Sequence, residues 1–549
     1  MSGFHADLDK CAPRPSPPGG KGFISGGMVT PLDGWGSKTM NGAESLVHTL
    51  IAGGIDTVFA NPGTSEMHFV AALDRIPGIN CVLCLDEGVV AGAADAYWRI
   101  TGKPAATLLH CGPGLANALA NLHNACRGRA GIVNIVGDQA TYHRPLDAPL
   151  TADTEGWARP VSGFLRTATQ ASLVGADAAE AITAAKAGMI ATLILPADTA
   201  WDEGGLVGTP RAAAARGAVD HNVIERAATV LRSGEPTVLL LGGSTLREHP
   251  LAIAGGIAAV TGARLRAEMS NARIERGAGR VEIERVPYFI DAALPALAGA
   301  KHIILVEAVP PVGFFAYPGK PGRLWPEDCT LHVLARAEQD GPAALASLAQ
   351  LLAAEPATAP NRKRTDPAQG PVTPQGFAQS LAALMPERTI IVDESISFGR
   401  GLFPITAQGP AHDWLALTGG AIGDGIPMAV GAAVGAPDRR VIALQADGSA
   451  MYTIAGLWTA ARSALNIVFV VLANRKYAIL LHELAGVGAN PGRTALDMLD
   501  LGRPDLDFVK IAEGMGVPAA AATSLDAFNT LLHASINQPG PSLIELRIG

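Results

Sequence analysis

Hydrophobic runs of four to seven residues alternate along this chain with longer segments in which small apolar residues recur at helical spacing. The runs predict strands, and the segments between them predict helices. The strands are expected at residues 57–60, 81–85, 105–109, 132–136, 191–195, 237–241, 302–306, 389–392, 440–444 and 467–472. Among the helices, one begins near Met40, one covers residues 87–97 and one ends near Leu122. This alternation indicates the α/β class with mostly parallel, doubly wound sheets.

Three stretches without periodicity divide the chain. Residues 1–39 include Pro-Ser-Pro-Pro-Gly-Gly and predict a flexible tail, so the patterned part begins at Met40. Polar stretches with Gly and Pro near residues 198–220 and 354–374 predict linkers. We therefore expect three doubly wound parallel-sheet domains of similar size, at 40–205, 206–360 and 361–549.

Composition narrows the class of protein. Apolar residues make up 48% of the 549 residues and charged residues 17%, which excludes disorder along the whole chain. The net charge is −8 with no basic face, so nucleic acid is not expected as a partner. The longest clean apolar run, residues 467–473, is too short to cross a membrane, and no secretory signal is evident.

The six cysteines are too sparse for a disulfide framework and indicate a reducing, cytoplasmic location. Cys81 and Cys84 form the one Cys-x-x-Cys pair, which raises the alternatives of a zinc site or a thiol-dependent redox protein. We expect buried strand cysteines instead, because a strand points the two thiols to opposite faces and no helix N-terminus activates either of them.

The segment that carries most chemistry is the apolar run at 441–446 with the Asp447-Gly448-Ser449 that follows it. In an open α/β sheet, ligands bind beyond the carboxyl ends of the strands. Gly448 allows a close approach of the backbone, while Ser449 and a helix N-terminus offer donors to an anion. Asp447 offers a hard oxygen ligand for Mg²⁺. Asp-Gly-Ser is also ordinary turn chemistry.

The next strand strengthens the metal interpretation. It ends at Asn474, 27 positions after Asp447. Two adjacent parallel strands would then end side by side, each with an oxygen ligand. Mg²⁺ keeps few protein ligands and completes its shell with water and phosphate oxygens. These residues therefore favour a magnesium-bound diphosphate.

This arrangement resembles the diphosphate motif of the thiamine diphosphate (ThDP) enzymes, which reads Gly-Asp-Gly and is followed by Asn. The block 446–459 is especially similar to benzoylformate decarboxylase, although Ala446 stands where the family usually has Gly. The resemblance implies a metal held by Asp447, the side chain of Asn474 and the main-chain carbonyl of Lys476. The other cofactor-binding residues that it implies are Thr64, Ser397, Gly420, Ile422, Gly448, Ser449 and Ile479. For Ser397, which would contact the diphosphate, a helix N-cap is the structural alternative.

The resemblance extends from about Met40 onward, in the family order of pyrimidine-binding, middle and diphosphate-binding domains. Glu87 matches the cofactor-activating glutamate, for which a helix N-terminal acid is the structural alternative. The carbonyl of Gly420 would accept the cofactor's amino group, and Ile422 matches the bulky apolar residue that holds the cofactor bent. Thr64 occupies the position of a serine in benzoylformate decarboxylase.

His110 follows a predicted strand, 23 positions after Glu87, as the active-site histidine of benzoylformate decarboxylase does. A histidine there is a natural proton relay, and a structural histidine bonded to a carbonyl is the alternative. However, residues 112–114 read Gly-Pro-Gly and resemble a turn of acetolactate synthase. The second histidine of benzoylformate decarboxylase has no counterpart in residues 314–320. His68 and His123 are expected at the surface or in helix packing.

The resemblance implies non-oxidative decarboxylation of a 2-keto acid by a ThDP- and Mg²⁺-dependent lyase, with aldehyde release or carboligation. The alternative is an acetolactate synthase-type carboligase that joins two 2-keto acids, with FAD possible in the middle domain. Residues 241–244 read Leu-Gly-Gly-Ser and either cradle a nucleotide or form a structural turn. Glu87, Asp447 and Asn474 argue against a non-enzymatic protein of this fold. The family places its active site between two subunits, which implies a homodimer at least and usually a homotetramer.

Overall fold

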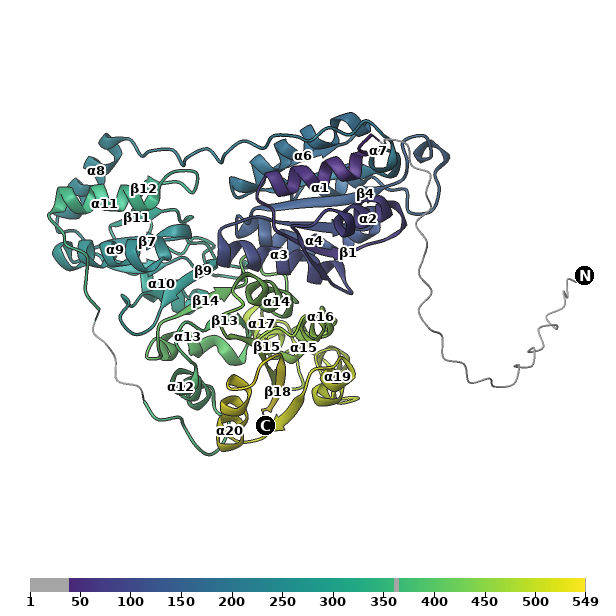
Figure 1. Cartoon of the computed structure of the whole chain (residues 1–549). Helices are drawn as coiled ribbons and strands as arrows, with labels where there is room; N and C mark the ends of the chain where they lie inside the picture. The colour runs from purple at the N-terminus through teal and green to yellow at the C-terminus, as the bar shows by residue number, and fades with distance from the viewer. Residues whose placement is uncertain (1–38, 360–364, 549) are drawn as a thin grey trace, which may run out of the picture. The chain divides into compact units, whose positions relative to one another are not determined.

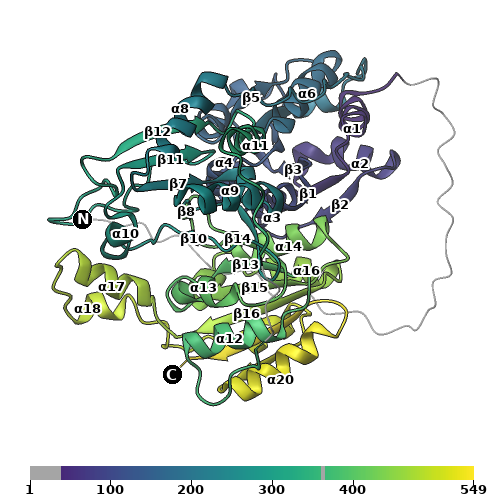
Figure 2. The same cartoon turned by 90° about the vertical axis from the view of Figure 1, so that its left-hand side faces the viewer.

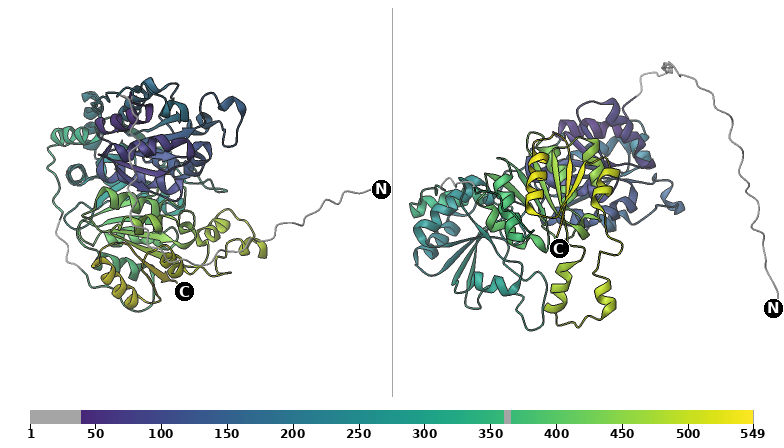
Figure 3. Two further views of the ribbon diagram at one scale, coloured as in Figure 1. Left: turned by 45° about the vertical axis from the view of Figure 1, so that its right-hand side comes forward. Right: turned by 90° about the horizontal axis from the view of Figure 1, so that it is seen from below.

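The strands form three sheets in the computed structural model, which describes residues 39–359 and 365–548 (Figure 1). Except for Thr39, the predicted tail lies outside the described residues, as does the part of the second predicted linker at 360–364. All ten predicted strands are confirmed, within two residues at either end. Figures 2 and 3 show the helices packed beside the strands. The α/β class with three mostly parallel sheets is therefore confirmed.

The first sheet is parallel throughout and has the order β2-β1-β3-β4-β6-β5. Its strands are β1 (Thr57–Asn61), β2 (Asn80–Leu83), β3 (Ala105–Leu109), β4 (Ile132–Asp138), β5 (Phe164–Thr167) and β6 (Ile190–Pro196). Its helices are α1 (Gly42–Ala52), η1 (Thr64–Glu66), α2 (Met67–Arg75), α3 (Glu87–Thr101), α4 (Cys111–Arg127), η2 (Arg144–Leu146), α5 (Thr154–Ala158), α6 (Ala171–Lys186) and α7 (Ala197–Trp201). The predicted first linker thus begins as the short helix α7.

The second sheet is parallel with the order β10-β8-β7-β11-β12. Its strands are β7 (Thr237–Leu241), β8 (Arg264–Ala267), β10 (Glu284–Arg285), β11 (His302–Val306) and β12 (Thr330–Ala335). Its helices are α8 (His221–Arg232), η3 (Gly243–Leu246), α9 (Glu248–Thr261), α10 (Ile290–Leu297) and α11 (Gly341–Leu352). The strand order reverses between β7 and β11, and ligands in such folds bind beyond the strand ends at that point.

The third sheet has the order β17-β18-β16-β15-β13-β14-β9. Its strands are β9 (Arg273–Arg276), β13 (Ile390–Glu394), β14 (His412–Ala416), β15 (Val441–Ala446), β16 (Ile467–Ala473), β17 (Ala519–Ala522) and β18 (Ser542–Arg547). Its helices are α12 (Pro374–Leu384), η4 (Phe398–Gly401), α13 (Leu402–Thr406), α14 (Gly425–Gly435), α15 (Asp447–Ala450), α16 (Gly456–Arg462), α17 (Ala478–Gly486), α18 (Arg493–Asp497), α19 (Phe508–Gly514) and α20 (Leu525–Ile536). The central strands are fully buried, as their continuous apolar runs require.

Strand β9 departs from the predicted arrangement of three separate blocks. It belongs to the middle segment of the chain but pairs antiparallel with β14 at the edge of the third sheet. Arg273 of β9 donates to Asp413 of β14 over 2.8 Å. Burial alone would raise the pKa of Asp413, but Arg273 and Arg439 hold it below its ordinary value. Paired charges therefore fix this strand, and its Arg-Ile-Glu-Arg sequence carries no apolar run.

Helices α3 and α14 join the first and third sheets through small residues. A Cβ on Gly431 of α14 would lie 1.9 Å from the carbonyl oxygen of Ala93 in α3. A Cβ on Gly92 would likewise lie 2.4 Å from Oδ1 of Asp424. The guanidinium of Arg99 at the end of α3 donates to the carbonyl of Ala416 over 2.7 Å. Backbone contact between the two helices thus requires glycine at these positions.

We predict that Gly431→Ala destabilises the protein, because backbone atoms of α3 would have to move. The expected loss is about 1–3 kcal/mol, seen as a lower melting temperature in a thermal-shift measurement. Gly514→Ala is the matched control, since this helical glycine has no atom within 4 Å of the added methyl group. Equal melting temperatures for both variants would contradict this account of the packing.

Candidate active site

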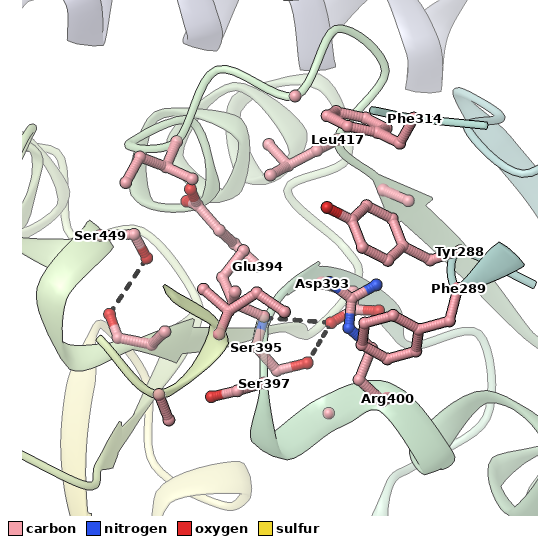
Figure 4. A pocket seen from close by; sticks show the side chains of 18 of the residues that line it. Tyr288, Phe289, Phe314, Asp393, Glu394, Ser395, Ser397, Arg400, Leu417 and Ser449 are labelled. Atoms are coloured by element: carbon pink, nitrogen blue, oxygen red, sulfur yellow. Dashed lines mark hydrogen bonds between the residues drawn. The ribbon is translucent and has the colours of Figure 1, made fainter. Parts of the chain in front are cut away.

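A cavity of about 860 Å³ opens beyond the carboxyl ends of β13, β15 and β16. Nine of the twelve residues that the sequence singled out line it: Ser397, Gly420, Ile422, Asp447, Gly448, Ser449, Asn474, Lys476 and Ile479. The other three are Thr64, Glu87 and His110, which lie in turns and helix ends that follow strands of the first sheet. No described residue before Met269 lines the cavity. Figure 4 shows Ser449 on one side of this space and Arg400, Tyr288 and Phe289 on the other.

Asp447 is a buried carboxylate at the first position of α15, 3% exposed. Its Oδ1 accepts from the amide of Gly448 over 2.9 Å, and its Oδ2 accepts from the amide of Arg475 over 2.6 Å. It forms no salt bridge within the described residues, and burial raises its pKa. A buried carboxylate without a cationic partner fits a site for a bound metal ion.

Asn474 follows β16 and lies beside Asp447, because β15 and β16 pair in parallel up to Ala446 and Leu472. Its Nδ2 lies 3.4 Å from Oγ of Ser397, and its Oδ1 accepts from the amide of Lys476 over 3.1 Å. The carbonyl of Lys476 accepts from the amide of Ala478 over 2.9 Å and has a second lone pair for a cation. The three expected metal ligands thus lie together beyond the carboxyl ends of β15 and β16.

The loop that contains Gly420 and Ile422 is held by a residue to which the sequence reasoning gave no role. Glu394, at the end of β13, is fully buried and accepts from the amides of Gly423 and Gly425 over 2.6 and 2.5 Å. Burial raises its pKa to about 7. Gly420 and Gly423 have φ values of +81° and +91°, which only glycine adopts without strain. An acid directly after a buried strand was the available signal.

Glu87 is buried at the N-terminus of α3, where Nδ2 of Asn117 donates to its Oε2 over 3.1 Å. Asp86 caps this helix by accepting from the amide of Val89 over 3.2 Å. Gly114 adjoins the Glu87 carboxylate so closely that a Cβ there would lie 2.9 Å from Oε1. The acid is therefore fixed by α4 rather than free in solvent.

His110 forms a pair with Glu66, a residue that the sequence reasoning missed. Its Nδ1 lies 2.9 Å from Oε2 of the fully buried Glu66, which also accepts from the amide of Gly63 over 2.7 Å. A Cβ on Gly63 would lie 2.2 Å from the imidazole ring, so the turn after β1 needs glycine there. With Nδ1–H directed at the carboxylate, Nε2 is available as the proton-exchanging atom. Thr64 lies in the same turn and is exposed.

Glu66, His110 and Cys111 also lie close enough together to be compared with a metal site. Burial raises the pKa of the Cys111 thiol to about 11, and its Sγ lies 3.2 Å from Oγ of Ser65. The contacts within this cluster are hydrogen bonds: Nδ1 of His110 lies 2.9 Å from Oε2 of Glu66, and the Cys111 thiol lies 3.2 Å from the Ser65 hydroxyl. They form a network that orients His110.

The middle-domain turn at Gly242 and Gly243 is occupied by the chain's own carboxylate. Glu307 follows β11 and is buried, and it accepts from the amide of Ser244 over 2.7 Å and from the amide of Gly341 over 3.1 Å. Arg216 adds an ion pair of 2.8 Å. A Cβ on Gly243 would lie 2.4 Å from Oε2 of Glu307. The donors that a nucleotide phosphate would need are therefore already used, and these residues do not fit FAD at this turn.

The Cys81 and Cys84 pair does not support a thiol redox site. Both are free thiols, Cys81 exposed and Cys84 buried. Burial raises the pKa of Cys84 to about 12 and raises that of Cys81. Thiols with raised pKa values are weak nucleophiles. The expectation of two buried strand cysteines is wrong in part, because Cys81 lies in β2 but is exposed, and Cys84 is buried but follows the end of β2 at Leu83. His68 and His123 are both exposed, and Nε2 of His123 lies 3.2 Å from the carbonyl of Gly419.

Comparison with known proteins decides the family. Residues 40–159 match the N-terminal TPP binding domain of thiamine pyrophosphate enzymes, and residues 402–546 match their C-terminal TPP binding domain. A Mycobacterium tuberculosis protein named "Putative acetolactate synthase large subunit IlvX" is 52% identical over 92% of this chain and 99% of its own length. This chain belongs to the thiamine pyrophosphate enzyme family.

Other members of the thiamine pyrophosphate enzyme family are more distant. Benzoylformate decarboxylase of Pseudomonas aeruginosa is 29% identical over 90% of this chain and 96% of its own length. The structure of Rhodococcus jostii 4-hydroxybenzoylformate decarboxylase superimposes with a TM-score of 0.80 at 25% identity, covering 93% of this chain and 99% of that one. In the part of the chain that the structure describes, no helix is long and apolar enough to cross a membrane.

The buried Glu394 makes stability depend on pH. Its pKa rises from an ordinary 4.5 to about 7, so the folded protein keeps a proton that the unfolded chain releases between these values. Its contribution to stability is therefore lost as the pH rises from about 4.5 to about 7. We predict that Glu394→Gln lowers the melting temperature, since a Gln amide accepts through one oxygen instead of two. It should also flatten this pH dependence.

The measurement is a series of thermal melts between pH 4.5 and 8. Glu180→Gln is the control, because Glu180 is 52% exposed and pairs only with Arg166 at the surface. A Glu394→Gln variant whose melting temperature follows pH as steeply as the wild type would show that another group titrates.

Proposed function

We propose that this chain is a ThDP- and Mg²⁺-dependent carboxy-lyase that decarboxylates a 2-keto acid without oxidation. One observation carries the proposal. Asp447 and Asn474 lie at the ends of adjacent parallel strands in a cavity, and among the described residues no Lys, Arg or His side chain forms an ion pair with the buried Asp447 carboxylate. Acetolactate synthase-type carboligation is the second candidate, favoured by the name of the M. tuberculosis relative. Domains at 40–205, 206–360 and 361–549 would provide the pyrimidine-binding, middle and diphosphate-binding parts.

In this proposal the third sheet holds the cofactor. Asp447, Asn474 and the carbonyl of Lys476 would bind Mg²⁺. The diphosphate would be held by Gly448, Ser449 and Ser397. The carbonyl of Gly420 would accept from the pyrimidine amino group, while Ile422 and Ile479 would support the rings. When bound, ThDP would supply the electron sink that 2-keto acid decarboxylation needs.

The first sheet would provide the proton chemistry. Glu87 would hold a proton at the pyrimidine ring, and Asn117 fixes its carboxylate for that task. His110 would move a proton at the reacting carbon through Nε2, with Glu66 as a positioning residue that keeps Nδ1 protonated. A relay of this kind favours protonation and aldehyde release over ligation, and it supports the decarboxylase as the first candidate.

Two copies of the chain would complete one site. The cavity takes no wall residue from the first sheet of its own chain, whereas the proposed chemistry needs Glu87 and His110 there. We therefore propose a homodimer in which the first sheet of one copy faces the cavity of the other, and two such dimers as a homotetramer. The filled turn at Glu307 supports an enzyme that works without FAD.

The proposal predicts that the purified protein releases CO₂ from pyruvate or benzoylformate only with ThDP and Mg²⁺. Glu87→Gln should lower the rate at least 100-fold while ThDP still binds, because the side chain keeps its size but can no longer exchange a proton. CO₂, aldehyde and acetolactate are measured together, and cofactor retention by calorimetry.

Full activity of Glu87→Gln would contradict the proposed mechanism. Acetolactate as the main product from pyruvate, or a flavin spectrum in the purified protein, would favour the acetolactate synthase-type alternative. Glu44→Gln is the control for an acid outside the site, since Glu44 lies in the first turn of α1, where it pairs with Arg75.

A further inference from the structure

One wall of the cavity is a row of aromatic side chains from the middle segment of the chain. The ring centroids of Tyr288 and Phe289 lie 5.2 Å apart, and those of Tyr288 and Phe314 lie 5.1 Å apart. A Cβ on Gly420 would lie 2.4 Å from Phe314, so this wall begins against the loop proposed to hold the pyrimidine. In the proposed site, the substrate side chain would extend from the cofactor rings beside the Gly420 loop toward this aromatic wall.

Arg400 of η4 presents its guanidinium to this wall. The guanidinium carbon lies 3.9 Å from the ring centroid of Tyr288 and 5.0 Å from that of Phe289 (Figure 4). Arg400 lines the cavity, and part of its side chain is accessible to solvent. The protein around its guanidinium nevertheless lowers its pKa by desolvation. The exposed surface therefore faces the cavity, where an arginine attracts anions more strongly than in open solvent.

The neighbouring acids Asp393 and Glu483 attract the Arg400 guanidinium and offset part of the lowering of its pKa by desolvation, but neither forms an ion pair with it. Asp393 accepts from the amide and hydroxyl of Ser395 and from Nε1 of Trp414, which uses both of its oxygens. Glu483 of α17 accepts from the hydroxyl of Tyr317 over 2.6 Å and faces that of Tyr288 at 3.5 Å. Within the described residues, no carboxylate lies within ion-pair distance of Arg400. Apart from a donor that reaches the hydroxyl of Tyr288, its planar set of N–H donors is therefore available to a ligand.

We propose that Arg400 binds a carboxylate of the 2-keto acid substrate and sets the preference for substrate shape. This inference rests on the proposed function. A guanidinium and a carboxylate form two parallel hydrogen bonds, and the aromatic rings on either side restrict the plane in which they form. The carboxylate is either the 2-keto acid's own or a second one at the end of its side chain.

The cofactor diphosphate is a less suitable partner for Arg400. Of the donors proposed for it, Gly448 and Ser449 lie beside Asp447, and Ser397 precedes the short helix η4 that carries Arg400. The guanidinium of Arg400 lies against the rings of Tyr288 and Phe289, across the cavity from Ser449 (Figure 4). Arg400 also approaches Tyr288 and Phe289, which come from a different segment than the diphosphate-binding strands. Substrate rather than cofactor is therefore expected between Arg400 and the loop at Gly420.

The test compares Arg400→Gln and Arg400→Lys with the wild type as holoenzymes. The control is Arg323→Gln, which removes an arginine stacked on Trp325 outside the cavity. Steady-state decarboxylation is measured with pyruvate, benzoylformate and 2-oxoglutarate, and ligation is measured with benzaldehyde, which carries no carboxylate. Arg400→Gln should lower kcat/KM for the acids about 10- to 100-fold and leave benzaldehyde ligation within a factor of three. Arg400→Lys should recover part of the loss, since it keeps the charge without the fork.

The three acids distinguish the two carboxylates. A loss confined to 2-oxoglutarate identifies the side-chain carboxylate, and an equal loss for all three acids identifies the reacting one; either supports the proposal. An equal loss for acids and benzaldehyde contradicts it, as does a ThDP affinity lowered tenfold or more, which would assign Arg400 to the diphosphate.

Binding of unreactive acids separates this inference from the proposed function. Benzoate and glutarate should raise the melting temperature of the holoenzyme and of Arg323→Gln, and should do so less or not at all for Arg400→Gln. That result supports the role of Arg400 even if no 2-keto acid is decarboxylated. Equal shifts in all variants, or no shift in any of them, would overturn it.

Discussion

The close contact between α3 and α14 is the constraint on which the rest of the site depends. Gly431 lets α14 reach the backbone of α3, and Gly92 lets α3 reach Asp424. Helix α3 begins with Glu87, and α14 begins directly after the loop of Gly420. Within each chain, one packing contact thus fixes both the acid proposed for one site and the cofactor loop proposed for the site shared with the other copy.

Three buried carboxylates show how the protein distributes charge around this frame. Glu307 is neutralised by Arg216 and by two backbone amides, so it closes its crevice. Glu394 has amide donors but no cation, and its pKa rises to about 7. Asp447 has amide donors and an open cavity beside it. A buried charge needs compensation. Glu394 and Asp447 both line the cavity, but Asp447 lies beside the side chain of Asn474 at the end of the adjacent strand, where a second oxygen ligand is available to an external cation.

Much of this fold follows from the sequence, because buried parallel strands are continuous apolar runs and each predicted run is a strand. The same rule predicts from the sequence that Asp447 and Asn474 follow the carboxyl ends of two adjacent parallel strands. Strand β9 does not follow this rule, since it has one buried apolar residue, Ile274, between charged residues, and Arg273 pairs with Asp413 of β14.

Several residues around the site could not be inferred in the same way. Glu66 lies in the short helix η1 after β1, and Glu394 is the last residue of β13. Neither position predicts which distant atoms its carboxylate binds. The sequence around Glu307 and Arg400 does not predict their roles either, because these depend on whether an oppositely charged side chain from another element lies nearby. Local pattern predicts elements and strand ends, while long-range hydrogen bonds decide what each buried charge does.

In the proposed dimer, Glu87 of one copy and Asp447 of another form one active site. Mixing equal amounts of Glu87→Gln and Asp447→Ala subunits, by co-expression with two tags and purification of the mixed form, tests it most directly. Each mixed dimer then contains one site with both substitutions and one intact site. The purified mixed form should therefore have about half of the wild-type decarboxylation rate per total site, while each parent has almost none. Mixed dimers as inactive as either parent would contradict this arrangement.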